Sequence, residues 1–207
     1  MHLLVTDRLA CPRCGPQFGL ILLADQMKDR RILEGALGCA NCRERYPVEG
    51  GFSDLRPPPR VQFSEGDPIP DSSPEDAFRL AALLGVEEGP GLLLLTGIWV
   101  AHAARLAAMI EDIEVVAAHP GLRGRTETAG VTRVDMGDRF PFFSGSLRGV
   151  ALEGPKTSRD LAEPLRVLGP GARVVIRSPA PGVLEGLEEA GMEILLQTHS
   201  FLVATRG

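Results

Sequence analysis

The chain has four cysteines, placed as two Cys-x-x-Cys pairs, Cys11 with Cys14 and Cys39 with Cys42. Such a pair turns both thiolates toward one ion, and two pairs together build the closed tetrahedral site that holds structural zinc. The spacer between the pairs is long enough for a β-hairpin. We therefore predict a zinc ribbon over residues 1–56, with these four cysteines as the metal ligands.

Two other interpretations of the cysteines have less support. Two disulfides would need an oxidising compartment, and the first residues lack the basic start and apolar core of a secretory signal. A thioredoxin-like redox motif would need a single pair beside a βαβ unit. Four thiolates also leave no open position on the metal, so we predict that the zinc has a structural role.

The composition limits the classes of function. The net charge of −5 argues against a scaffold that holds nucleic acid by bulk electrostatics. The most apolar window, residues 91–110, contains His102 and Arg105 and changes its period midway. It therefore predicts a buried strand followed by a helix, and not a membrane span. We expect a soluble, cytoplasmic protein with neither a membrane nor a nucleic acid as its partner.

Short apolar runs between the two cysteine pairs predict the strands of the ribbon. These runs are Leu20–Leu23 and Arg31–Leu37, and the polar stretch Asp25–Arg30 suits the turn between them. Tyr46–Val48 follows the second pair as another extended piece. Residues 57–73 begin with three consecutive prolines and continue with glycine, proline and serine, which predicts an extended linker.

Beyond the linker, helices and strands alternate. Ser73 is a good helix N-cap ahead of Pro74, and Gly85 can end that helix. This alternation predicts an α/β domain over residues 74–207, with a parallel sheet and helices on both faces. The predicted strands are Leu92–Leu95, Glu114–Ala118, Gly130–Val134, Arg148–Leu152, Ala172–Arg177, Met192–Gln197 and Phe201–Thr205. The further predicted helices are Trp99–Ile110, Ser158–Leu168 and Pro181–Ala190.

The segments that flank the cysteines resemble a known family. Leu9-Ala10-Cys11-Pro12 and Tyr46-Pro47-Val48 are similar to the small zinc-ribbon proteins that activate tRNA, rRNA and release-factor methyltransferases, and to their short bacterial relatives. In that family the eukaryotic member holds a methyltransferase as an obligate partner. The resemblance therefore implies a protein partner for the ribbon.

Residues 75–207 resemble a class I S-adenosylmethionine-dependent methyltransferase. The segment Leu161–Ala172 is similar to that family's turn into its fifth strand, and Leu187–Met192 is similar to its entry into the sixth. The resemblance implies a Rossmann-like sheet that ends in an antiparallel hairpin.

The residues that hold the cofactor in that family are mostly replaced. Its first strand leads into an acid and a Gly-x-Gly-x-Gly loop, which lets the backbone approach the cofactor. In this chain Leu94 replaces the acidic residue. Thr96, Ile98 and Val100 stand at the glycine positions, and Gly97 is the one glycine that remains. We expect these side chains, together with Trp99, to fill the cofactor's space.

Two further positions correspond to cofactor contacts. His119 stands where the family has the acid that binds the ribose hydroxyls, and a neutral imidazole accepts fewer hydrogen bonds than a carboxylate. Asp138, within Gly137–Phe142, matches the position that contacts the adenine amino group. Gly97, His119 and Asp138 are thus the candidate residues for S-adenosylmethionine.

These observations favour a zinc-binding, methyltransferase-like protein without catalytic residues. It would act by binding a protein partner, either a methyltransferase or a second copy of itself. Two alternatives stay open, namely an active S-adenosylmethionine-dependent methyltransferase with an atypical pocket and an RNA-binding zinc-ribbon module. The sequence leans against an enzyme because the cofactor residues are degenerate while the fold residues persist.

Overall fold

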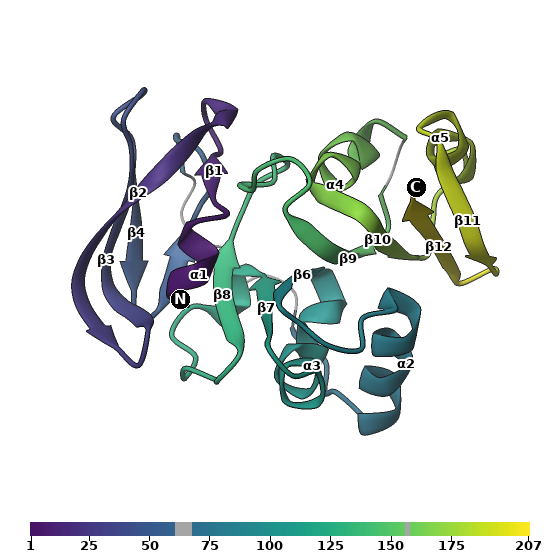
Figure 1. The fold of residues 1–207 in the computed structure, drawn as a ribbon, viewed down its shortest axis with the longest axis horizontal. Helices are drawn as coiled ribbons and strands as arrows, with labels where there is room; N and C mark the ends of the chain where they lie inside the picture. The colour runs from purple at the N-terminus through teal and green to yellow at the C-terminus, as the bar shows by residue number, and fades with distance from the viewer. Residues whose placement is uncertain (61–67, 156–157) are drawn as a thin grey trace.

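The computed structural model describes residues 1–60, 68–155 and 158–207. Its twelve strands form one sheet, in the order β1-β2-β3-β4-β5-β8-β7-β6-β9-β10-β12-β11 (Figure 1). The first five strands build the ribbon and pair antiparallel with one another. They are β1 (Ala10–Cys11), β2 (Gly15–Lys28), β3 (Arg31–Cys39), β4 (Arg45–Glu49) and β5 (Phe52–Asp54).

The other seven strands form the α/β part. They pair in parallel except for β12, which lies antiparallel between β10 and β11. This confirms the predicted parallel sheet with a C-terminal antiparallel hairpin. The strands are β6 (Gly91–Thr96), β7 (Ile113–Ala118), β8 (Val131–Asp135), β9 (Leu147–Glu153), β10 (Leu168–Arg177), β11 (Met192–Gln197) and β12 (Phe201–Arg206).

Helices cover both faces of this sheet. On one face lie α2 (Pro74–Leu84) and α3 (Ala103–Met109), and on the other lie α4 (Ala162–Val167) and α5 (Val183–Glu189) (Figure 1). Successive side chains of a strand point to opposite faces, so Leu93 and Leu95 belong to one core and Leu92 and Leu94 to the other. Both cores are fully apolar along β6, as expected for a strand buried on two sides.

The ribbon and the α/β part share the sheet through β5. This strand pairs in parallel with β8, with Phe52 opposite Arg133 and Asp54 opposite Asp135. The sequence did not predict β5, because three residues between a turn and a proline run give no periodic signal. The domain boundaries at residues 56 and 74 stay predictions, and residues 61–67 of the predicted linker lie outside the described part.

The N-terminal residues take the place of a helix over β7 and β8. Between β8 and β9 the chain, described in full there, forms no helix, and Met1, Val5, Leu9 and Phe142 join Val116 and Val134 in one core. The short helix α1 (Leu3–Thr6) belongs to these N-terminal residues. The backbone N–H of His2 donates to the Thr132 hydroxyl on β8 at 2.9 Å. The ribbon thus closes the core of the α/β part.

Several predicted element bounds were wrong. The stretch Asp25–Arg30 was expected to be a turn, but β2 continues to Lys28, and the turn is limited to Asp29 and Arg30, both with positive φ. The helix expected from Trp99 starts as a 3₁₀ helix, η1 (Gly97–His102), before α3. The helix expected over Ser158–Leu168 is likewise a 3₁₀ turn, η3 (Ser158–Leu161), followed by α4.

Candidate functional site

The four cysteines meet at one point inside the ribbon. Their sulfur atoms all lie within 4.8 Å of one another, with Cys11 and Cys42 3.7 Å apart and Cys14 and Cys39 3.8 Å apart. A tetrahedral ion with bonds of about 2.3 Å to sulfur places its ligands about 3.8 Å apart. A disulfide needs sulfurs at about 2.05 Å, so the geometry fits a metal ion and not two disulfides.

The surroundings of the sulfurs suit thiolates bound to a cation. The Cys14 backbone N–H and the Asn41 amide donate to sulfurs, and the Tyr46 hydroxyl lies 3.6 Å from Cys11 Sγ. Burial, followed by hydrogen bonds with the other thiols, raises the pKa of Cys42 to about 12. A metal ion binds the deprotonated form of its cysteine ligands, so a cation at this point would hold the four sulfurs as thiolates.

The first knuckle is attached to the loop that follows β8. The Arg139 guanidinium donates to the carbonyls of Pro12 and Arg13 at 3.4 and 3.2 Å. In the same loop Phe142 forms a β-bridge with Leu9, just before Cys11. The cysteine cluster is therefore attached to the segment that contains the candidate residue Asp138.

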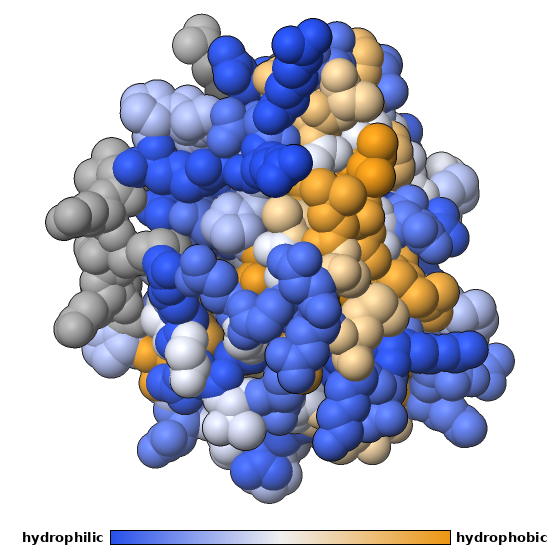
Figure 2. Space-filling view, turned by 90° about the vertical axis from the view of Figure 1, so that its left-hand side faces the viewer, coloured by the Kyte–Doolittle hydropathy of each residue, from blue (hydrophilic) through white to orange (hydrophobic). Residues whose placement is uncertain are grey.

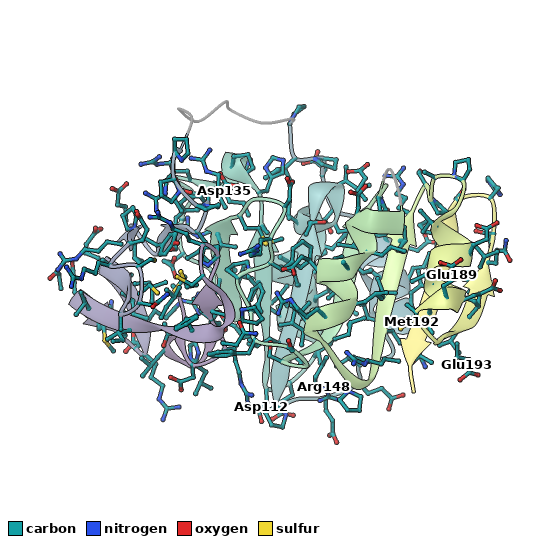
Figure 3. The ribbon with its side chains drawn as sticks, turned by 90° about the horizontal axis from the view of Figure 1, so that it is seen from above. Asp112, Asp135, Arg148, Glu189, Met192 and Glu193 are labelled. Carbon is teal, nitrogen blue, oxygen red and sulfur yellow. The ribbon has the colours of Figure 1, made fainter. Side chains whose placement is uncertain are left out.

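A cavity of about 440 Å³ lies at the carboxyl ends of the strands, beside this loop. Ligands of open α/β sheets bind at this edge. Figure 3 shows the two edges, with Asp135 at the carboxyl end of β8 and with Asp112 and Arg148 on the opposite side. The residues that line the cavity include Thr96, Met136, Asp138, Phe140, Glu153 and Asp160. The cavity is acidic, and its described lining includes no arginine, lysine or histidine.

Gly97 lies after β6, but its open side faces a protein side chain. Its φ is +58°, and a Cβ built there would lie 2.6 Å from Oε2 of Glu153. The same oxygen accepts a hydrogen bond from the Ile98 backbone N–H at 3.1 Å. Backbone N–H groups that open a helix are the natural binding site for an anionic group. Here the protein's own carboxylate satisfies the N–H group of Ile98.

Asp138 and His119, the other two candidate cofactor residues, lie in different surroundings. Asp138 is exposed and lines the cavity together with Thr96. His119 is outside the described lining, and its Nδ1 accepts a hydrogen bond from the Gly121 backbone N–H at 3.1 Å at the start of η2 (Pro120–Leu122). His119 therefore serves as a helix cap, and only Asp138 and the end of β6 come together.

Trp99 lies in the core on the face of the sheet that α2 and α3 cover. It is buried in the core below α2, and its indole N–H donates to the Leu152 carbonyl at 2.9 Å. With Ile98 it lines a second cavity of about 330 Å³ and not the one beside Asp138. The expectation that Trp99 fills the cofactor's space stays a prediction, and the side chain that lies against the loop is Glu153. No local pattern in the sequence pointed to Glu153, because its contact with Ile98 depends on the register of β6 and β9.

The fold of this chain is similar to that of a solved methyltransferase structure. A geranyl diphosphate methyltransferase in complex with SAM aligns with a TM-score of 0.51 and 13% identity, over 65% of this chain and 85% of that one. The [4+2]-cyclase SpnF gives 0.48 and 20% identity, over 59% of this chain and 58% of the cyclase. A SAM-dependent methyltransferase from Aquifex aeolicus gives 0.43 and 14%, over 65% and 98%. The alignment with the geranyl diphosphate methyltransferase, at 13% identity, shows a shared fold and nothing beyond it.

The sequence comparisons add no relative. No protein-family model matches the chain, and no curated protein does. The resemblance of the ribbon to the methyltransferase activators thus stays a prediction. Among the described residues, the structure contains no helix with the length and apolar character needed to cross a bilayer.

Proposed function

We propose that this protein is a zinc-stabilised, non-catalytic scaffold with a methyltransferase fold, which acts by associating with a second copy of itself through the ribbon. The observation that supports the loss of catalysis is the contact of Glu153 with Gly97 and Ile98. A cofactor that used this loop would have to displace a carboxylate already bound to it. Leu94, fully buried, stands where the resemblance expects an acid.

Zinc supports the scaffold by holding the ribbon together. The ribbon has few large apolar side chains at its knuckles, and the binding of zinc to such peptides is worth about 10–16 kcal/mol. The separations between the sulfurs favour Zn²⁺ with four thiolates, which leaves no position for a substrate. The metal therefore contributes folding energy and not chemistry.

The surface proposed for association is the outer side of β2. Figure 2 shows an apolar band on the face formed by the ribbon, and the exposed apolar side chains of β2 are Phe18, Ile21, Leu23 and Met27. Beyond Leu20, β2 has β3 as its one strand partner in the described chain, because β1 pairs only with Gly15 and Gly19. An apolar strand with a free edge is a template for pairing with another chain.

A second copy fits this edge better than an unrelated partner. The segment from Leu20 to Ala24 pairs with β3 in regular register and contains no charge. Two copies can therefore lie antiparallel about a twofold axis with no like charges facing each other. Such an isologous contact uses the same apolar side chains twice, as closed dimers commonly do.

The mass of the zinc-loaded protein in solution tests this proposal. Size exclusion with light scattering at micromolar concentration should give a dimer, and the double variant Ile21→Lys with Leu23→Lys should give a monomer. Leu195→Lys, on the other edge strand β11, is the matched control, because Leu195 is 42% exposed and Leu23 44%. A monomeric wild type, or a variant that stays dimeric, would contradict the proposal.

A second candidate function is an active methyltransferase with an atypical pocket. The observation in its favour is the cavity beside Asp138, whose 440 Å³ is within the range of about 300–1,000 Å³ for ligand pockets. Calorimetry with S-adenosylmethionine separates the two candidates. Micromolar binding that Asp138→Ala abolishes would favour the enzyme. For the scaffold we expect no heat of binding at 100 μM ligand, which is about a hundred times a micromolar Kd.

A further inference from the structure

The second cavity, about 330 Å³, lies between α2, η1 and the ends of β10 and β12. Its aromatic walls are Trp99, His102 and Phe201. The ring centroids of Trp99 and His102 are 6.0 Å apart, and those of Trp99 and Phe201 are 6.1 Å apart. Leu80 and Leu83 of α2 complete the apolar part. Walls of this kind suit a planar ring.

One wall of this cavity contains Arg177, whose guanidinium lacks a partner within the part of the chain that the structure describes. Arg177, half-buried at the end of β10, stands directly opposite Phe201 on β12, so the two side chains share one face of the sheet. Across the described residues its guanidinium makes no hydrogen bond or ion pair. Its other neighbour, Glu153 on β9, turns its carboxylate to Ile98 instead. A half-buried guanidinium without a counter-ion favours an anionic ligand.

The remaining charges of the lining are mostly paired. Asp76 accepts from Ser73 at 2.7 Å and lies 3.5 Å from Arg79, so its charge is partly neutralised. Asp71 is an exposed carboxylate among the lining residues. The Nδ1 atom of His102 lies 2.7 Å from the Ser72 hydroxyl, which fixes the imidazole as a wall.

We infer that this cavity binds a small aromatic anion, with its ring between Trp99 and Phe201 and its carboxylate or phosphate on the guanidinium of Arg177. The site shares none of its described lining residues with the cavity beside Asp138, and it is independent of the association through β2. A bidentate arginine contact provides the specificity for the anion, and the apolar walls select a flat ring.

Trp99, the one tryptophan in the chain, reports on occupancy directly. Phenyl phosphate is titrated into the zinc-loaded protein while the emission of Trp99 is followed, with phenol as the uncharged probe and benzoate as the carboxylate probe. We expect a saturable change with phenyl phosphate or benzoate, and the stronger of the two identifies the preferred anion. Phenol should bind at least about 10-fold more weakly, because a hydrogen bond to a charged group contributes about 1.5–3 kcal/mol.

The variant Arg177→Gln should weaken the preferred anion at least about 10-fold and leave phenol unchanged. Arg177→Lys keeps the positive charge but lacks the planar guanidinium, so its affinity for the anion should lie between those of the wild type and Arg177→Gln. Arg45→Gln, at an exposed position of β4, is the matched control and should bind like the wild type. The proposal is overturned by an unsaturable response, by equal binding of phenol, or by an Arg177→Gln variant that binds as well as the wild type.

Discussion

The Arg139 guanidinium donates a hydrogen bond to the backbone carbonyl of Arg13 at 3.2 Å, across 126 positions of sequence. Arg139 follows Asp138, which lines the cavity at the carboxyl ends, and Arg13 lies within the first metal knuckle. The cysteine cluster and the loop that forms one wall of this cavity are therefore in direct contact.

Removing the metal should loosen this wall. We expect about one zinc per chain by metal analysis, and chelation or the variant Cys42→Ser should speed amide exchange at residues 137–143 as well as in the knuckles. The reason is that Leu9 and Ala10, next to Cys11, are bonded to Phe142 and Pro141. Amides of β10, far from the knuckles, are the internal control. Unchanged exchange at residues 137–143 would show that the loop does not depend on the metal.

Two glycines with positive φ should differ in how they tolerate alanine. Gly97 and Gly124 have φ of +58° and +71°, but a Cβ at Gly97 meets Glu153, whereas a Cβ at Gly124 meets nothing within 4 Å. Gly124→Ala should cost about 1 kcal/mol of unfolding free energy for its backbone alone. Gly97→Ala should cost about 2–3 kcal/mol, because Glu153 must also move. Equal costs in denaturant titrations would argue against close packing of Glu153 on the loop.

A partly buried arginine joins the ribbon to the α/β part. Arg31 on β3 lies 2.6 Å from Glu127 and 3.3 Å from Glu114 on β7, and its side chain is only 13% exposed. Arg31→Ala leaves two carboxylates without this partner and should cost about 3 kcal/mol. Arg79→Ala, which breaks two exposed pairs on α2, should cost less than about 1 kcal/mol. Denaturant unfolding of both variants gives the comparison.

The stability should fall in acid because of Glu127. Its burial would raise the pKa, but hydrogen bonds from Arg133 and Arg31 outweigh burial, so the pKa lies below the ordinary 4.5. A carboxyl with a lowered folded pKa stabilises fully above its unfolded pKa and loses this effect as the pH falls through the folded one. The unfolding free energy should therefore decline below about pH 4.5. Glu127→Gln should be less stable at pH 7 and decline less steeply.

The sequence by itself determined the local features. The spacing of the two Cys-x-x-Cys pairs is short enough for the backbone to aim each pair of sulfurs, so the metal site follows without knowledge of the fold. The helix α2 was equally predictable, because Ser73 caps its first turn and Gly85 ends its last turn. The alternation of strands and helices also fixed the class of fold, because it depends on periods of a few residues.

Only the tertiary structure decided which distant segments meet. The pairing of β5 with β8 and the contact of Glu153 with Ile98 both depend on strand register. A shift of one residue in register would turn each of these side chains to the opposite face, and no local pattern encodes that choice. For the same reason only the pairing of β10 with β12 places Arg177, whose guanidinium has no partner among residues 1–60, 68–155 and 158–207, beside Phe201.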